Sequence, residues 1–142
     1  MPFLPEAIWR RRVDAEYTRL RDSGERFQVN ADKTRYVISV AGPGLYKQGS
    51  TLTRRFNHDV EIVLKREYPY AGGIEVVWLT PIFHPNIRED GRVCIHLLNE
   101  WSEAQTLDAL VNALRQLLKA PNYHDALNKE AADYFAENNV VL

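Results

Sequence analysis

Residues 35–40 read Arg-Tyr-Val-Ile-Ser-Val, an order in which every second side chain is large and apolar or aromatic. Successive side chains of a β-strand point to opposite faces, so this run predicts a strand with one buried face. Residues 60–64, Val-Glu-Ile-Val-Leu, show the same alternation. The core-facing side chains expected from the two runs are Tyr36, Ile38, Val40, Val60, Ile62 and Leu64.

The longer stretch around these runs, from Phe27 to Leu79, is typical of short strands separated by turns. Turn-forming residues gather at 41–44, Ala-Gly-Pro-Gly, and at 57–59, Asn-His-Asp. The sequence therefore predicts an antiparallel meander of about four strands, the last over residues 74–79.

Helical periodicity precedes this stretch. Residues 6–22 carry apolar side chains three to four positions apart, and Pro5 and the pair Ser23-Gly24 can start and end a helix. The pattern predicts an amphipathic helix whose exposed face is rich in arginine.

Two more helices are expected after the strands. A strongly apolar central helix should begin at its cap, Thr106, and stop at Pro121. A short last helix should run from residue 126 or 128 to 137, with Asp125 or Asn128 as its cap. Strands followed by helices predict an α+β fold in which helices pack on one face of an antiparallel sheet.

The bulk composition is that of one soluble globular domain spanning residues 1–142, with 45% hydrophobic content. A formal net charge of −1 gives no global reason to expect nucleic-acid binding. A single cysteine argues against a disulfide scaffold. The N-terminus lacks the order of a secretory signal, and no apolar run is long enough for a membrane span, so the cytoplasm is the expected location.

The candidate chemistry lies in residues 84–94, His-Pro-Asn-Ile-Arg-Glu-Asp-Gly-Arg-Val-Cys, which set an amide side chain eight residues before the only cysteine. A free thiol is only a few per cent ionised at neutral pH, yet its thiolate attacks acyl carbon well. Cys94 is therefore a candidate acyl carrier, although Val93-Cys94-Ile95 taken alone is also compatible with an inert core strand.

These residues resemble the ubiquitin-conjugating enzymes, which accept a ubiquitin-like protein as a cysteine thioester and pass it on. The landmarks that carry the resemblance are Tyr68-Pro69-Tyr70, His84-Pro85-Asn86, Gly91, Cys94, Trp101-Ser102 and Pro121-Asn122. The resemblance implies an N-terminal helix, a four-stranded meander, a central helix and a short C-terminal helix. The family usually has one more helix, for which this chain leaves no room before Leu142.

The resemblance also assigns roles at the site. Cys94 would carry the thioester, and Asn86 would stabilise the oxyanion of acyl transfer or, alternatively, only form a turn with its own backbone. Asp125 would orient or deprotonate an acceptor lysine, or would only cap the last helix. His84 and Pro85 would be structural. His96 stands where many lysine-directed members have aspartate.

Partner surfaces follow from the same resemblance. Arg11 and Arg12 fall on basic positions that meet the activating enzyme and some ligases, although charge runs are usually just solvated. Tyr70, Ser102 and Ala104 fall on the two loops that ligases such as RING domains grip, but Glu103 and Gly72-Gly73 replace the family's prolines there.

Two other functions remain open at this point. One is a non-catalytic module of the same fold that binds a ubiquitin-like protein. The other is a cysteine hydrolase in which His84, His96 or His124 serves as base and Asp125 as its orienting acid. Scattered histidines beside one cysteine lack the paired spacing of metal sites, and no phosphate-binding loop is present, so no cofactor is expected.

Overall fold

The structure is a computed structural model that describes residues 3–93, 98, 101–123, 126–138 and 140. Cys94, His96, His124 and Asp125, all named above, lie outside the described residues. Described helices and strands are α1 (Glu6–Asp22), β1 (Phe27–Val29), β2 (Arg35–Gln48), β3 (Thr51–Leu64), β4 (Ile74–Trp78), α3 (Leu107–Lys119) and α4 (Lys129–Glu137).

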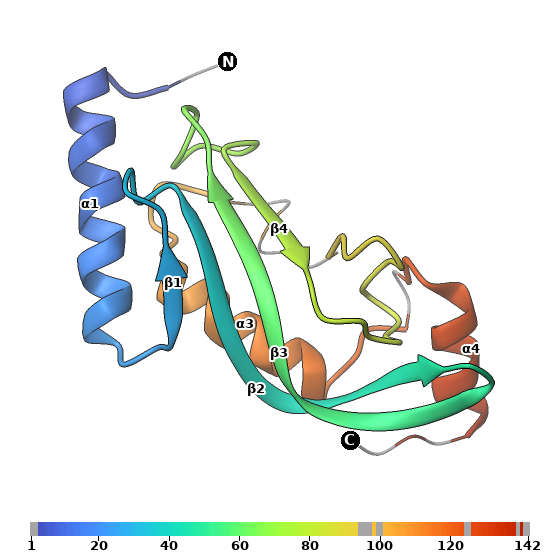
Figure 1. The fold of residues 1–142 in the computed structure, drawn as a ribbon. Helices are drawn as coiled ribbons and strands as arrows, with labels where there is room; N and C mark the ends of the chain where they lie inside the picture. Colours follow the sequence, from blue (N-terminus) through green and yellow to red (C-terminus); the bar gives the residue numbers. More distant parts are fainter. Residues whose placement is uncertain (1–2, 94–97, 99–100, 124–125, 139, 141–142) are drawn as a thin grey trace.

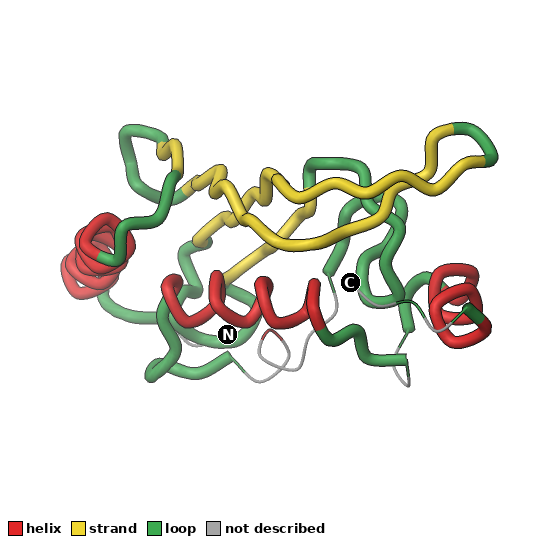
Figure 2. Tube along the Cα trace, turned by 90° about the horizontal axis from the view of Figure 1, so that it is seen from below, coloured by secondary structure: helices red, strands yellow, loops and turns green. Residues whose placement is uncertain are grey.

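The strands form one antiparallel sheet in the order β1-β2-β3-β4, as expected of a meander (Figure 1). Helix α3 lies against one face of this sheet, and α1 and α4 lie at its two ends (Figure 2). The expected α+β fold is confirmed. No described helix is long and apolar enough to cross a membrane.

The core lies between the sheet and α3. All six side chains predicted to face it are buried, with at most 2% of their surface exposed. The α3 side chains that are also buried are Leu107, Leu110, Val111, Leu114, Leu117 and Leu118. The predicted caps are confirmed for both later helices: the Thr106 side chain accepts from the Ala109 N–H, and the Asn128 side chain accepts from the Ala131 N–H.

The positions of the turns were predicted wrongly. Residues 41–44 form an irregularity inside β2, and residues 57–59 lie within β3. The hairpin instead turns at Gly49, whose φ of 65° is in the left-handed region that glycine adopts without strain. Gly44 serves close packing, because a Cβ there would lie 2.7 Å from Cε1 of His58. Each long strand therefore has 14 residues.

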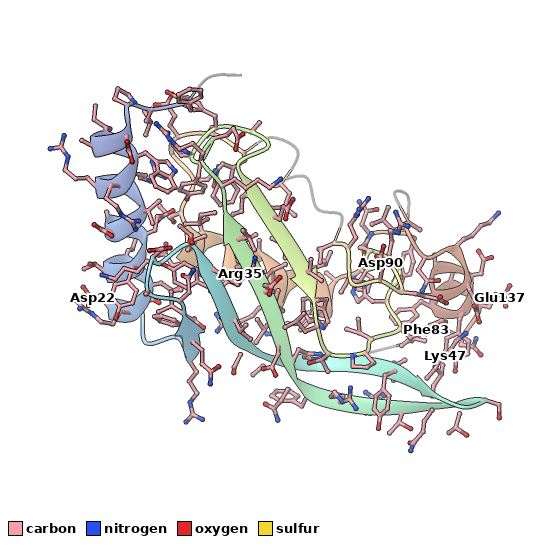
Figure 3. The ribbon with its side chains drawn as sticks, turned by 45° about the horizontal axis from the view of Figure 1, so that its top comes forward. Asp22, Arg35, Lys47, Phe83, Asp90 and Glu137 are labelled. Atoms are coloured by element: carbon pink, nitrogen blue, oxygen red, sulfur yellow. The ribbon has the colours of Figure 1, made fainter. Side chains whose placement is uncertain are left out.

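The outer half of the β2–β3 hairpin contributes to a second, smaller core beside α4. Leu45 of β2 packs there with Phe83 and with Ala131 and Phe135 of α4. The Lys47 ammonium forms an ion pair with Glu130 of α4. It also lies over the Phe83 ring, and Lys47 and Phe83 are both labelled in Figure 3. The hairpin thus fixes α4 next to the segment that follows Phe83.

Candidate active site

The candidate site begins where the chain leaves Phe83. Ile87 pairs with Val93, the residue immediately before Cys94, and the N–H of Arg88 donates to the carbonyl of Arg92 over 2.8 Å. Gly91 has a φ of 92°, and a Cβ there would lie 2.3 Å from the Trp78 carbonyl oxygen. Only glycine therefore fits this tight turn, which brings Ile87 beside Val93.

His84 is almost fully buried, with 1% of its surface exposed. Its Nδ1 accepts a hydrogen bond from the Asn86 N–H over 3.0 Å, so Nε2 carries the proton and donates to the Leu117 carbonyl, 2.9 Å away. Burial lowers the pKa of His84 to about 4, so the ring is neutral near pH 7. Both nitrogens are bound to backbone, which agrees with a structural role and leaves neither available as the base of a cysteine hydrolase.

His84 should make the fold sensitive to acid. Its pKa falls from 6.5 to about 4 on folding, so the unfolded chain takes up the proton first as pH drops. The contribution of His84 to the free energy of unfolding is therefore fully present above about pH 6.5. It is lost as pH falls toward 4, by up to about 3 kcal/mol. Urea unfolding at pH 7.5 and pH 4.5 measures the loss.

His84→Asn is the matched control, because its side-chain oxygen can accept from the Asn86 N–H without titrating. We expect the difference in unfolding free energy between the native chain and this variant to shrink at pH 4.5. An equal acid loss in both proteins would mean that other groups, such as the buried His58 with its lowered pKa, cause it.

The amide of Asn86 is buried and joins two loops. Its Nδ2 donates to the carbonyl of Asn122 over 2.7 Å, and its Oδ1 accepts from the Asn122 N–H over 2.8 Å. The side chain thus connects two backbone segments that are 36 residues apart in sequence. The bridge fixes the amide group between the 84–87 turn and the loop after α3.

Pro85 anchors the same loop from its other side. Its carbonyl accepts hydrogen bonds from the N–H groups of Leu127 and Asn128, at 2.9 and 3.0 Å. The short segment that contains Asp125 is thus bounded on both sides by residues bound to the 84–86 turn. The cap of α4 is Asn128, so the proposal that Asp125 caps this helix is wrong.

The residues predicted to meet partners lie at the other end of the molecule, near the start of α1. Arg11, Ser102 and Ala104 are exposed, and Tyr70 is half-buried. Arg12 instead points inward and donates to the carbonyls of residues 103 and 105.

Sequence reasoning missed the partner of Arg12, the buried Glu16. Its carboxylate accepts from the Tyr68 hydroxyl and lies 3.8 Å from Arg12 Nη2, and burial raises its pKa. The helical spacing of the sequence could have shown that Glu16 is buried, because it lies on the same stripe of α1 as the buried Val13 and Leu20.

Comparisons with known proteins agree with the fold. A sequence model described as ubiquitin-conjugating enzyme matches residues 12–141. The protein named "Probable ubiquitin-conjugating enzyme E2 L460" of Acanthamoeba polyphaga mimivirus is 26% identical over 139 residues, which cover 92% of this chain and 84% of that protein.

A second relative, the NEDD8-conjugating enzyme UBC12 of Saccharomyces cerevisiae, is 41% identical over 102 residues, covering 71% of this chain and 50% of its own length. Among solved structures, the E2 domain of a Toxoplasma gondii ubiquitin conjugating enzyme superposes with a TM-score of 0.73 at 26% identity, covering 90% of this chain and 86% of that one. The match over residues 12–141, together with this superposition, shows that the chain belongs to the ubiquitin-conjugating enzyme family.

Proposed function

We propose that this chain carries a ubiquitin-like protein as a thioester on Cys94, in the cytoplasm, and transfers it to a lysine or cysteine acceptor. The observation that supports this most is the bridge between Asn86 and Asn122, which orients an amide group next to Ile87, the residue that pairs with Val93 just before Cys94. The bridge holds this buried amide in one orientation, which is what a donor to a developing oxyanion requires.

Loading is an exchange of thioesters. The Cys94 thiolate attacks the carbonyl carbon of the modifier's C-terminal glycine, a new C–S bond forms, and the thiolate of the activating enzyme leaves. In discharge, the acceptor amine attacks the same carbon, a C–N bond forms and the Cys94 thiolate leaves. The Asn86 amide would stabilise the oxyanion of the tetrahedral intermediate, and Asp125 would orient the amine or take its proton.

Partners follow from these steps. The chain would meet a ubiquitin-like protein, an activating enzyme that contacts the exposed Arg11, and a RING-type ligase that grips the loops of Tyr70 and of Ser102 and Ala104. Nothing in the proposed chemistry requires a metal or nucleotide on this chain.

The decisive experiment mixes the purified chain with an activating enzyme, ATP and either ubiquitin or a NEDD8-type modifier, followed by a non-reducing gel. We expect an adduct with at least one modifier that disappears on adding reductant. If neither modifier gives an adduct although the activating enzyme charges a control conjugating enzyme, the chain is a non-catalytic binding module of this fold.

A further inference from the structure

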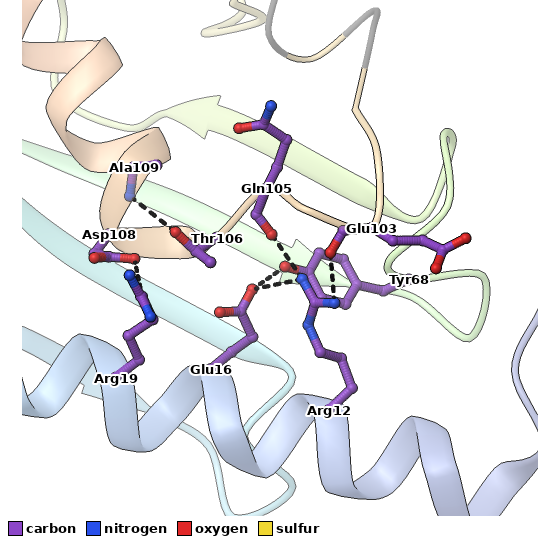
Figure 4. A network of polar contacts seen from close by, with 9 residues as sticks. All are labelled: Arg12, Glu16, Arg19, Tyr68, Glu103, Gln105, Thr106, Asp108 and Ala109. Atoms are coloured by element: carbon purple, nitrogen blue, oxygen red, sulfur yellow. Dashed lines mark hydrogen bonds and ion pairs between the residues drawn. The ribbon is translucent and has the colours of Figure 1, made fainter.

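Two loops near the N-terminal end of α1 make up the surface that we propose for ligases. We call residues 68–73 the tyrosine loop and residues 101–105 the tryptophan loop. They are far apart in sequence, yet both contact the same turn of α1 (Figure 4). The ring centroids of Tyr68 and Trp101, one from each loop, are 5.9 Å apart.

Arg12 holds the tryptophan loop. Its Nη1 donates to the Glu103 carbonyl over 2.8 Å, and its Nη2 donates to the Gln105 carbonyl over 2.6 Å. A guanidinium is a rigid planar fork, so two bonds from one group fix the position of the loop backbone as well as its distance from α1. The side chains between and beside these carbonyls, including Ser102 and Ala104, remain exposed.

The same arginine contacts the tyrosine loop. Its guanidinium carbon lies 5.3 Å from the centroid of the Tyr68 ring, within the range of a cation–π contact. The Tyr68 hydroxyl donates to Glu16, which is 2% exposed and lies 3.8 Å from Arg12. Arg12, Glu16 and Tyr68 therefore form one cluster that attaches both loops to α1.

We infer that Arg12 is a positioning residue, which sets the spacing of the tyrosine and tryptophan loops from inside the molecule and does not itself meet the activating enzyme or the ligase. A partner that grips both loops needs them at a fixed separation, and each bond that orders them beforehand lowers the cost of binding. The identity of the partner, a RING-type ligase, rests on the proposed function. The structural role of Arg12 does not.

Amide hydrogen exchange on the isolated chain tests the structural role directly. Arg12→Ala should speed exchange of the Gln105 N–H, which donates to the Ser102 carbonyl over 3.0 Å, by at least ~10-fold, since it removes the two hydrogen bonds that hold this loop to α1. Two matched controls come from the same helix. Arg11→Ala removes an exposed arginine, and Arg19→Ala removes the arginine that pairs with Asp108 of α3 over 2.9 Å. Neither should alter exchange of the Gln105 N–H.

Arg12→Lys covers the case in which the alanine variant does not fold. Lysine keeps a positive charge beside Glu16 but offers one nitrogen in place of two, so exchange in the tryptophan loop should still rise. Unchanged exchange of the Gln105 N–H in a folded Arg12 variant would overturn the inference.

The functional readout compares loading with ligase-stimulated discharge, using a RING domain that accelerates discharge of the native chain. Arg12→Lys should load at a rate within about twofold of the native chain but require at least ~10-fold more RING domain for half-maximal stimulation. A slower loading rate with normal RING stimulation would mean that Arg12 contacts the activating enzyme, which overturns the inference. If no variant loads at all, the proposed function fails, while the exchange result still decides the role of Arg12.

Discussion

Cys94→Ser is expected to change the chemistry of the adduct from a thioester to an oxygen ester, or to abolish it. Serine presents a hydroxyl with almost no ionised fraction at neutral pH, so loading should fall steeply even where the ester forms. The measurement is a gel run with and without reductant after charging. An ester survives reductant and is cleaved by alkali, whereas the thioester of the native chain is cleaved by both.

The result of this experiment has a single interpretation, because Cys94 is the chain's only cysteine. No second thiol can take over the modifier in the variant. A reductant-labile adduct that persists in Cys94→Ser would therefore remove the thioester assignment altogether. Cys94→Ala is the control for modifier attached elsewhere, since it can form neither bond, and its unfolding midpoint should match that of the serine variant.

The strands and helices of this fold were predictable because they depend on periodicity. Tyr36, Ile38 and Val40 alternate with exposed or half-buried residues, and the apolar stripe of α3 repeats at helical spacing. These patterns determine which face is buried whatever the details of packing. The caps Thr106 and Asn128 were predictable for the same reason, since each depends on a local hydrogen bond.

The turns were less predictable because glycine has more than one structural use. Gly42 and Gly44 are typical of a turn, yet both lie where a Cβ would collide, with Leu118 and His58 respectively. Gly49 uses its freedom of φ and makes the actual hairpin turn. Composition alone does not separate close packing from a left-handed backbone.

The contacts of the site were beyond sequence reasoning because they join residues far apart in the chain. Nothing near Asn86 indicates that its amide binds the backbone of Asn122. Likewise, Arg11 and Arg12 are neighbours of equal charge, but only Arg12 points inward toward Glu16 and the tryptophan loop. The resemblance assigned roles to these residues, and the structure shows what Asn86 and Arg12 contact.

Asn86→Ala should cause the largest loss of rate among the variants that keep Cys94. If its amide stabilises the oxyanion, removing that donor should raise the barrier by about 2.7–4 kcal/mol and slow discharge onto free lysine by ~10²–10³-fold. The same change removes both hydrogen bonds to Asn122, which should lower the unfolding free energy by roughly 1–3 kcal/mol. Single-turnover discharge and urea unfolding measure the two effects separately.

Asn86→Asp distinguishes the chemical role from the bridging role. Its carboxylate can still accept from the Asn122 N–H but has no N–H group to donate to an oxyanion, and its negative charge opposes the developing one. We therefore expect discharge onto lysine to be at least as slow in the aspartate variant as in the alanine variant, even if its stability is partly restored. If discharge instead recovers in step with stability across the two variants, Asn86 acts only through its bridge to Asn122. The rate of acyl transfer would then depend on how firmly the loop after α3 is held, and the oxyanion donor would have to be sought elsewhere around Cys94.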